Sequence, residues 1–478
     1  MSTPGPPDQD TAAPVWHCRA GAVVGWRDAG VLRATGIRYA RAQRYAAPVP
    51  EPPAAEPIRA TQWSPACPQP AVPLLEAVLG DAMAGLTYDE DCQRLSVTVP
   101  VGSGPDDALP VMVWIHGGSY TSGAGDAPIF DPAALVREQS VVVVSVTYRL
   151  GLLGYLGGPD GPPANLGLLD QLEALRWVRR NIAAFGGEPD AVTLFGQSAG
   201  ADAVAHLMVA DGAEGLFRRA VVQSAPLGLT RGRAPMTAAM ARQASRVPVD
   251  APVSDVVAAQ AGVLRAARRF GVTAAMPFGV QYGHAPLPAE DEVDQRWRQA
   301  ATQVDLLVGG TDRETALYIG AVPGMERVVG VPVLGRVVRR SVVARTTRRI
   351  YGDGTDAFVR RHAAGGGRGY RYLLSWGAET NPYAGAHTID MPLLFGNRTA
   401  WEGTALLAGT AWDEVEEAGS SLRLLWAEFA RSGTLPIVHV PGLIRVDPIV
   451  TARRATPRPT GPPWGSPSGC RSRGGRRS

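Results

Sequence analysis

Two patterns of apolar residues alternate along the chain: continuous apolar runs, and apolar residues spaced three and four positions apart. Continuous apolar runs rich in β-branched residues are typical of strands covered on both faces of a sheet, and they predict strands at residues 111–115, 141–146, 192–195, 219–224, 304–308 and 370–374. Residues 166–185 instead carry leucines and aromatic residues at spacings of three and four, which predicts an amphipathic helix that ends at Gly186. Strands that alternate with helices predict an α/β fold with a mostly parallel central sheet and helices on both faces.

The segments outside this alternating pattern are more irregular. Residues 21–39 contain short apolar runs broken by glycines, which predicts antiparallel strands at an edge of the sheet. Residues 230–300 are predicted to contain two helical segments, 236–246 and 253–270. This region is well placed to form a cap-like insertion over a site in the sheet.

The two ends of the chain are predicted to be disordered. Residues 1–15 are rich in proline and acidic residues, and residues 451–478 are rich in proline, glycine and arginine. From residue 435 onward the chain shows no helical or strand pattern. We therefore expect one domain over residues 16–450, followed by a tail that is either a disordered extension or the product of a reading-frame change.

The charge balance gives no reason to expect a nucleic-acid partner. Residues 451–478 hold seven arginines and no acidic residue, so the rest of the chain carries 40 basic and 44 acidic residues, a net charge of −4. The start of the chain lacks the basic and apolar regions of a secretory signal, and no apolar run approaches the roughly 18 residues of a membrane span. We expect a cytoplasmic protein without a membrane partner. Its four cysteines lack metal-type spacing, so no metal site is expected.

The stretch AVTLFGQSAGA at residues 191–201 carries the strongest chemical signal. It is typical of a strand, a tight turn with Ser198 at its tip, and a helix. Gly196 and Gly200 stand two residues before and two residues after the serine, where side chains would collide with the backbone of so sharp a turn. The following helix directs its free amides and its positive dipole end at the same place. The pattern therefore favours Ser198 as a nucleophile.

A serine nucleophile needs a base and an acid that orients the base. In a doubly wound hydrolase these residues follow strands, in the chain order serine, acid, histidine. Elimination among the seven histidines leaves His387, which lies in a loop of small residues after the strand at 370–374. Asp312 and Glu314 both follow the strand at 304–308, and their spacing alone does not choose between them.

The loop after the strand at 111–115 is the predicted oxyanion hole. His116, Gly117 and Gly118 come directly after a buried strand, where free backbone amides can point at a developing oxyanion. Each such donor stabilises the transition state by about 2.7–4 kcal/mol. Gly117 is expected to support this loop.

With these residues in place, the chain resembles the type-B carboxylesterases, a family that includes bacterial carboxylesterases, p-nitrobenzyl esterases and the cholinesterases. The similarity extends from about residue 21 to residue 435. It rests on GIRYA (36–40), EDC (90–92), VWIHGG (113–118), VTYRLGLLGY (146–155), the block from 165 to 201, QSAPLG (223–228), VGGTDRE (308–314) and AHTIDMPLLFGN (386–397). The long central block makes the similarity specific. It implies an α/β-hydrolase fold and a serine carboxylesterase that acts on a small-molecule ester without a cofactor.

The resemblance also implies the roles of the candidate catalytic residues. Ser198 matches the nucleophile of the family and His387 matches its base. The acid of the family falls on Glu314 and not on Asp312. Ser224 matches a buried serine that supports the acid.

The oxyanion donors of the family match the backbone amides of Gly118, Ser119 and Ala199. The loop departs from the family because Ser119 and Tyr120 replace its usual glycine and phenylalanine. Ser119 still has a backbone amide, so we expect the hole to survive with an altered shape.

Other features bear on the state and function of the protein. Cys67 and Cys92 match a disulfide of the family, and the region 230–300 is short, which implies a reduced cap. A monomer is expected. The alternative hypotheses are a non-catalytic binding protein with the same fold, and a hydrolase that uses the same residues on carbamates, amides or lipids.

Overall fold

A mixed sheet of eleven strands runs through the protein, with the strand order β15-β16-β14-β13-β12-β11-β9-β10-β8-β4-β3. The computed structural model describes residues 13–158, 161–321 and 334–450. Of the ends predicted to be disordered, residues 1–12 and 451–478 lie outside the described residues, whereas the prediction is wrong for Val15, which begins β1. The six neighbouring strands from β14 to β10 are parallel, and antiparallel strands flank them on both sides. The prediction of an α/β fold with a mostly parallel central sheet is confirmed.

All the predicted strands are present. The parallel strands are β9 (Leu109–Ile115), β10 (Val142–Val146), β11 (Gly187–Gln197), β12 (Arg219–Gln223), β13 (Asp305–Thr311) and β14 (Gly369–Leu374). The antiparallel strands are β3 (Trp26–Asp28), β4 (Val31–Arg38) and β8 (Arg94–Pro100) at one edge, and β15 (Val438–Val440) and β16 (Ile444–Pro448) at the other. Two smaller sheets contain β1 (Val15–Cys18), β2 (Gly21–Val24) and β7 (Ile58–Arg59), and β5 (Ala40–Arg41) and β6 (Val49–Pro50).

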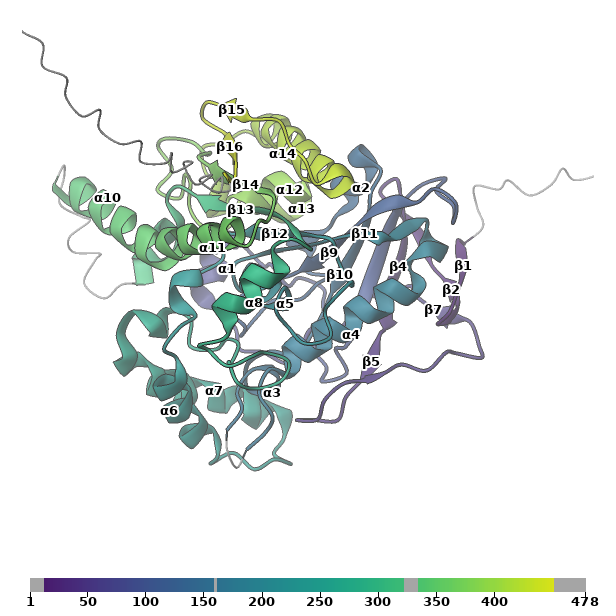
Figure 1. Ribbon diagram of the computed structural model, residues 1–478, viewed down its shortest axis with the longest axis horizontal. Helices are drawn as coiled ribbons and strands as arrows, with labels where there is room; N and C mark the ends of the chain where they lie inside the picture. Colours follow the sequence, from purple (N-terminus) through teal and green to yellow (C-terminus); the bar gives the residue numbers. More distant parts are fainter. Residues whose placement is uncertain (1–12, 159–160, 322–333, 451–478) are drawn as a thin grey trace, which may run out of the picture.

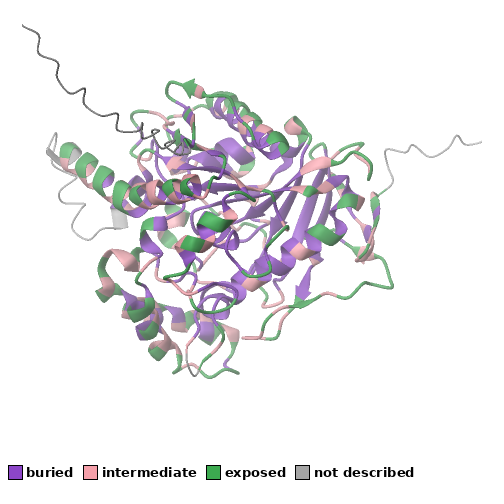
Figure 2. Cartoon of the chain, in the orientation of Figure 1, coloured by how far each residue is buried: buried purple, intermediate pink, exposed green. Residues whose placement is uncertain are grey.

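The sheet is covered on both faces, as its apolar runs predicted. Along β9, the side chains of Val111 and Val113 enter one hydrophobic core, whereas those of Met112 and Trp114 enter the other. In Figure 1, α2 and α14 lie on one side of the sheet and α4 on the other, and the strands between them are buried in Figure 2. No helix in the described ranges combines the length and hydropathy of a membrane span.

The helices fall into two groups by the core they contact. The first core is covered by α3 (Gly151–Gly154), α4 (Leu166–Asn181), α5 (Ala199–Leu207), α6 (Ala234–Ala244), α7 (Val253–Ala267), α8 (Val293–Ala300) and α11 (Asp353–Ala364). The second is covered by α1 (Pro73–Leu79), α2 (Ala133–Gln139), α10 (Leu334–Thr347), α12 (Asp390–Phe395), α13 (Arg398–Trp401) and α14 (Trp412–Ser432). Shorter turns are η1 (Pro128–Phe130), η2 (Ile182–Phe185), η3 (Leu227–Leu229), η4 (Arg268–Ala275), η5 (Glu314–Ala321), η6 (Arg348–Gly352) and η7 (Ala405–Leu407).

The predicted amphipathic helix at 166–185 is confirmed as α4 continued by η2. It ends at Gly186, which has the left-handed φ of 82° that glycine adopts at little cost. The helical segments predicted within residues 230–300 are confirmed as α6 and α7, which pack against each other.

The prediction that regular structure ends at residue 435 is wrong. β15 and β16 form an antiparallel pair, and β16 pairs with β14, which extends the sheet to residue 448. These strands were missed because both are short and partly exposed, with β15 at the edge of the sheet and β16 next to it, so no continuous run of apolar residues marks them. Their pairing depends on β14, which is distant in the sequence.

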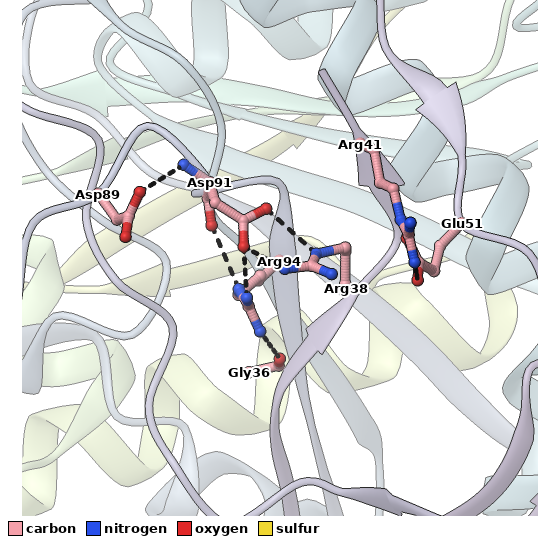
Figure 3. Close-up of polar contacts among 7 residues, drawn as sticks. All are labelled: Gly36, Arg38, Arg41, Glu51, Asp89, Asp91 and Arg94. Carbon is pink, nitrogen blue, oxygen red and sulfur yellow. Dashed lines mark hydrogen bonds and ion pairs between the residues drawn. The ribbon is translucent and has the colours of Figure 1, made fainter. Parts of the chain in front are cut away.

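A charged cluster fixes the segment that precedes β8 (Figure 3). The carboxylate of Asp91 accepts hydrogen bonds from Arg38 on β4 and from Arg94 on β8, and Arg94 also donates to the carbonyl of Gly36 over 3.1 Å. Burial alone would raise the pKa of Asp91, but the two guanidinium groups outweigh it and lower the pKa. The cluster anchors one end of the segment between Cys67 and Cys92, which lines the site described next.

Candidate active site

Ser198 occupies a sharp turn between β11 and α5. Its φ of 58° and ψ of −127° are unusual for a residue with a side chain, and such a conformation persists only where the surroundings impose it. A Cβ atom at Gly196 would lie 2.7 Å from the carbonyl carbon of Gly200, and one at Gly200 would lie 2.0 Å from the carbonyl oxygen of Ile115. Both glycines are therefore required by close backbone contact, as the sequence pattern predicted.

His387 is joined to Glu314 by a short, buried hydrogen bond. Its Nδ1 lies 2.5 Å from Oε2 of Glu314, and its backbone amide donates to the carbonyl of Glu314 over 3.0 Å. The second carboxylate oxygen, Oε1, accepts the amide of Thr311 at 2.7 Å. Asp312 instead hydrogen-bonds with Ser375, and burial raises its pKa. Of the two acids that spacing left open, Glu314 is the one in contact with the histidine.

The histidine has a second partner that the sequence did not single out. The side-chain amide of Gln197 lies 3.1 Å from Nε2 of His387. Ser198 Oγ makes no hydrogen bond within the described part of the chain, although it lines the same cavity as His387. In unliganded enzymes the bond between nucleophile and base is often long and shortens when substrate binds. Gln197 was missed because no general rule gives this position of the turn a role.

The surroundings of His387 are largely apolar and aromatic. The rings of Tyr318 and Tyr351 lie 5.7 and 5.2 Å from the imidazole ring. Asp390, at the start of α12, is fully buried, and burial together with the charge of Glu314 raises its pKa to about 6. Burial also lowers the pKa of His116 to about 4, so that ring is uncharged at neutral pH.

The loop after β9 leaves backbone amides free beside Ser198. Gly118 and Ser119 have φ values of 111° and 55°, and neither amide donates a hydrogen bond within the described residues. Ala199 is the first residue of α5, so its amide has no acceptor within the helix. A Cβ atom at Gly117 would lie 3.1 Å from that of Ser198, which shows how closely the loop approaches the serine. These residues are the ones predicted for the oxyanion hole.

Two other expectations differ from the structure. The hydroxyl of Ser224 is buried and has no hydrogen-bond partner among the described residues, so it does not support Glu314 through a hydrogen bond. Cys67 and Cys92 are free buried thiols in contact with each other, so the implied disulfide is not formed. The hydrogen bond with Cys67 and burial together raise the pKa of the Cys92 thiol, which favours its protonated form.

Two cavities meet at Ser198, and Ser119 and Tyr318 also line both. The first cavity, of about 470 Å³, contains His387 and is walled by α1 and the rest of the segment between Cys67 and Cys92. The second cavity has a volume of about 600 Å³ and is walled by residues of η3, η4, η5, α10 and η6. Its lining is mainly apolar and includes Leu229, Met276, Ile319, Val342 and Ile350.

A parallel sheet, a serine on a strand-turn-helix and a buried glutamate–histidine pair define an α/β-hydrolase. No group of histidine, cysteine or acidic side chains within residues 13–158, 161–321 and 334–450 is arranged to hold a metal ion.

Comparisons with known proteins lead to the same class of enzyme. Residues 13–329 match the carboxylesterase family. A probable N-octanoylanthranilate hydrolase of Rhodococcus erythropolis is 38% identical over 84% of this chain and 89% of its own length. The para-nitrobenzyl esterase of Bacillus subtilis is 31% identical over 86% of this chain and 88% of its own. A solved thermophilic p-nitrobenzyl esterase superposes with a TM-score of 0.74 at 28% identity, covering 91% of this chain and 98% of that one.

The chain belongs to the carboxylesterase family and is a serine hydrolase of carboxylic esters. The resemblance to the type-B carboxylesterases and the α/β-hydrolase fold that it implied are confirmed.

Proposed function

We propose that the enzyme cleaves small carboxylic esters through an acyl-enzyme formed on Ser198, with His387 as base and Glu314 as the orienting acid. The observation that carries the proposal is the 2.5 Å contact between His387 Nδ1 and Glu314 Oε2 in the cavity that Ser198 lines. A buried carboxylate in this position holds the imidazole in one tautomer and stabilises its charge when it accepts a proton.

In the first half-reaction, the hydroxyl of Ser198 attacks the ester carbonyl while Nε2 of His387 takes its proton. The amides of Gly118, Ser119 and Ala199 stabilise the oxyanion of the tetrahedral intermediate. The imidazolium then protonates the departing alcohol, and the acyl group stays on the serine. In the second half-reaction, His387 takes a proton from water and the resulting hydroxide attacks the acyl-enzyme. The imidazolium then returns this proton to Ser198 Oγ as the bond to the acyl group breaks, and the acid product leaves.

The two cavities receive the two halves of the ester. Because His387 protonates the leaving group, the alcohol must lie on the side of the histidine, which is the cavity walled by α1. The acyl chain then enters the apolar cavity lined by Leu229 and Met276. Residues of η4 and Met276, within the region expected to be a cap, form part of its wall. This supports a cap role for that region.

Amide hydrolysis is the second candidate function. It is favoured by the similarity to the probable N-octanoylanthranilate hydrolase and by the apolar acyl cavity, which suits a medium-length chain. The alcohol-side cavity carries the carboxylates of Glu76 and Asp81, which repel an anionic leaving group. We therefore propose that esters with a neutral leaving group are the better substrates.

The test is hydrolysis of p-nitrophenyl acetate, butyrate, octanoate and palmitate, and of N-octanoylanthranilate, by the wild type and by Ser198→Ala. The proposal expects turnover of the short and medium esters, a loss of roughly 10⁴-fold or more in the variant, and slower cleavage of the anthranilate amide. A folded wild type no faster than the variant on every ester contradicts it. If the amide is turned over faster than the octanoate ester, amide hydrolysis becomes the first candidate function and ester hydrolysis the second.

The remaining proposals concern the protein as a whole. Residues 16–450 form one domain, which is supported by the single sheet that joins β3 to β15. A cytoplasmic location, a monomeric state and the absence of nucleic-acid or membrane partners stay predictions from the sequence.

A further inference from the structure

The oxyanion loop has a strained backbone. Gly118, Ser119 and Tyr120 have consecutive positive φ values of 111°, 55° and 60°. A residue with a side chain is strained in this region and keeps the conformation only when its surroundings impose it. Ser119 and Tyr120 are such residues, so specific contacts must hold the loop in place.

Tyr120 supplies those contacts from three directions. Its ring packs against that of Tyr155, with 4.4 Å between the centroids. Its carbonyl accepts the amide of Gly151 at 2.7 Å. Its hydroxyl donates to Oδ2 of Asp202 at 2.6 Å, and both side chains are fully buried. Burial and the neighbouring Asp202 charge raise the pKa of Tyr120 well above its usual value, so the phenol remains a hydrogen-bond donor.

Asp202 lies in the first turn of α5, the helix that begins with Ala199. Its amide donates to the carbonyl of Ser198 at 2.9 Å. The bond from Tyr120 to Asp202 therefore connects the loop that carries two of the proposed oxyanion donors to the helix that carries the third.

The carboxylate of Asp202 is costly for a purely structural contact. Its Oδ1 atom is buried without a hydrogen-bond partner in the described part of the chain, and Nδ1 of His206 lies 3.6 Å from it. Well-packed apolar residues often stabilise a fold as well as a buried charge does. The retained charge gives the tyrosine hydroxyl a strong acceptor, because hydrogen bonds to ionised groups are shorter and stronger than neutral ones.

We propose that Tyr120 is a positioning residue of the oxyanion hole, which acts through its hydrogen bond to Asp202. The bond keeps the amides of Gly118 and Ser119 aligned with that of Ala199. This inference rests on the proposed function, because it assumes that these three amides bind the oxyanion.

The test compares Tyr120→Phe with Tyr155→Phe. The first variant removes only the hydroxyl that binds Asp202. The second is a matched control, because Tyr155 is equally buried, its hydroxyl accepts a hydrogen bond from Gln171, and phenylalanine keeps the ring that packs against Tyr120. Tyr120→Phe is expected to lower kcat about tenfold with KM within about twofold, less than the 10²–10³-fold lost when a donor is removed outright. Tyr155→Phe is expected to leave kcat within about twofold even where its Tm falls equally.

A second readout separates positioning from stability. A trifluoromethyl ketone forms a tetrahedral oxyanion adduct on the serine, so its affinity should fall in Tyr120→Phe by the same factor as kcat/KM. Asp202→Asn keeps an acceptor oxygen and should retain activity within about threefold, whereas Asp202→Leu should resemble Tyr120→Phe. The double variant Tyr120→Phe/Asp202→Leu should lose no more than either single variant.

Several outcomes overturn the inference. The first is an unchanged kcat in Tyr120→Phe, and the second is an equal loss of kcat in Tyr120→Phe and Tyr155→Phe. The third is an affinity for the trifluoromethyl ketone that does not fall with kcat/KM. The fourth is a loss of activity in Asp202→Asn. Ser198→Ala, measured in parallel, tests the proposed function separately. If Ser198→Ala is inactive and Tyr120→Phe is unaffected, only the positioning role fails, whereas an active Ser198→Ala removes the proposed function itself.

Discussion

The side-chain amide of Gln197 donates a hydrogen bond to Nε2 of His387 across 3.1 Å. An amide nitrogen can only donate, so Nε2 is the unprotonated nitrogen of the ring and Nδ1 carries the proton that it donates to Glu314. This is the tautomer that a general base toward Ser198 requires. In the proposed mechanism the serine hydroxyl bonds to this same nitrogen, so substrate binding would have to exchange Gln197 for Ser198 as the partner of Nε2.

Replacement of Gln197 by glutamate is predicted to change the pH dependence of activity. The groups that face the imidazole are the Glu314 and Asp390 carboxylates and the rings of Tyr318 and Tyr351. An added carboxylate at Nε2 stabilises the protonated ring, so the acid limb of kcat/KM should move to higher pH. Gln197→Met, which has a similar size and no charge, should move it less. An identical acid limb in wild type and Gln197→Glu contradicts this prediction.

Glu314→Gln is predicted to lower kcat by about 10⁴-fold with little change in KM, because a neutral side chain neither fixes the tautomer of His387 nor stabilises its positive charge. Asp312→Asn is the matched control. Asp312 lies two residues away in the same loop and bonds to Ser375 instead of the histidine. The values of kcat and KM for both variants, measured with p-nitrophenyl butyrate, decide which of the two carboxylates is the acid. If Asp312→Asn is the more damaging variant, the assignment of the acid is wrong.

Asp390 is predicted to make the protein less stable as pH rises. Its Oδ2 accepts a hydrogen bond from Gln223 at 2.9 Å, and its Oδ1 has no partner among the described residues. Its pKa is about 6 in the folded protein, above the value of about 4 in an unfolded chain. The protonated form is thus favoured by folding, and this stabilisation is complete below pH 4 and is lost as pH rises through 6.

Asp390→Asn removes this titration and serves as the test. The free energy of unfolding of the variant, relative to wild type, should increase by up to about 3 kcal/mol between pH 4 and pH 7.5. Urea unfolding of both proteins at the two pH values measures it. A difference between the proteins that does not vary with pH rules out the assigned cause.

Filling the apolar cavity is predicted to shorten the accepted acyl chain. Val342 on α10 lines this cavity, so Val342→Trp should reduce kcat/KM for p-nitrophenyl octanoate at least tenfold more than for the acetate. Val337→Trp, on the same helix at a side chain that is 56% exposed, should affect both esters equally. If Val342→Trp lowers the two esters by the same factor, the acyl chain does not enter this cavity.

The sequence predicted the central part of the fold and the centre of the site well, because local pattern determines both. Buried parallel strands give continuous apolar runs, and the turn at Ser198 depends on glycines only two residues away. The edge strand β15 and its neighbour β16 lack such runs, since the side chains of Val438–Val440 are partly or largely exposed and those of Ile444–Pro448 are only partly buried.

The rest of the site depends on contacts between residues far apart in the chain. The partners Glu314 and His387 are 73 residues apart, and only the resemblance to a family chose Glu314 over Asp312. The bond between Tyr120 and Asp202 spans 82 residues. No periodicity or spacing rule reaches over such distances, so these pairs become visible only in the folded chain.

The most direct test of the central claim is covalent labelling with diethyl p-nitrophenyl phosphate, followed by mass spectrometry of the digested protein. Ser198 Oγ should attack phosphorus and displace p-nitrophenolate, because the same hydroxyl, base and oxyanion donors act on this centre. We predict one p-nitrophenolate released per chain, a single diethylphosphoryl group on Ser198, and complete loss of ester hydrolysis in step with labelling. Labelling at another residue, or full activity in a protein labelled at Ser198, would contradict the account.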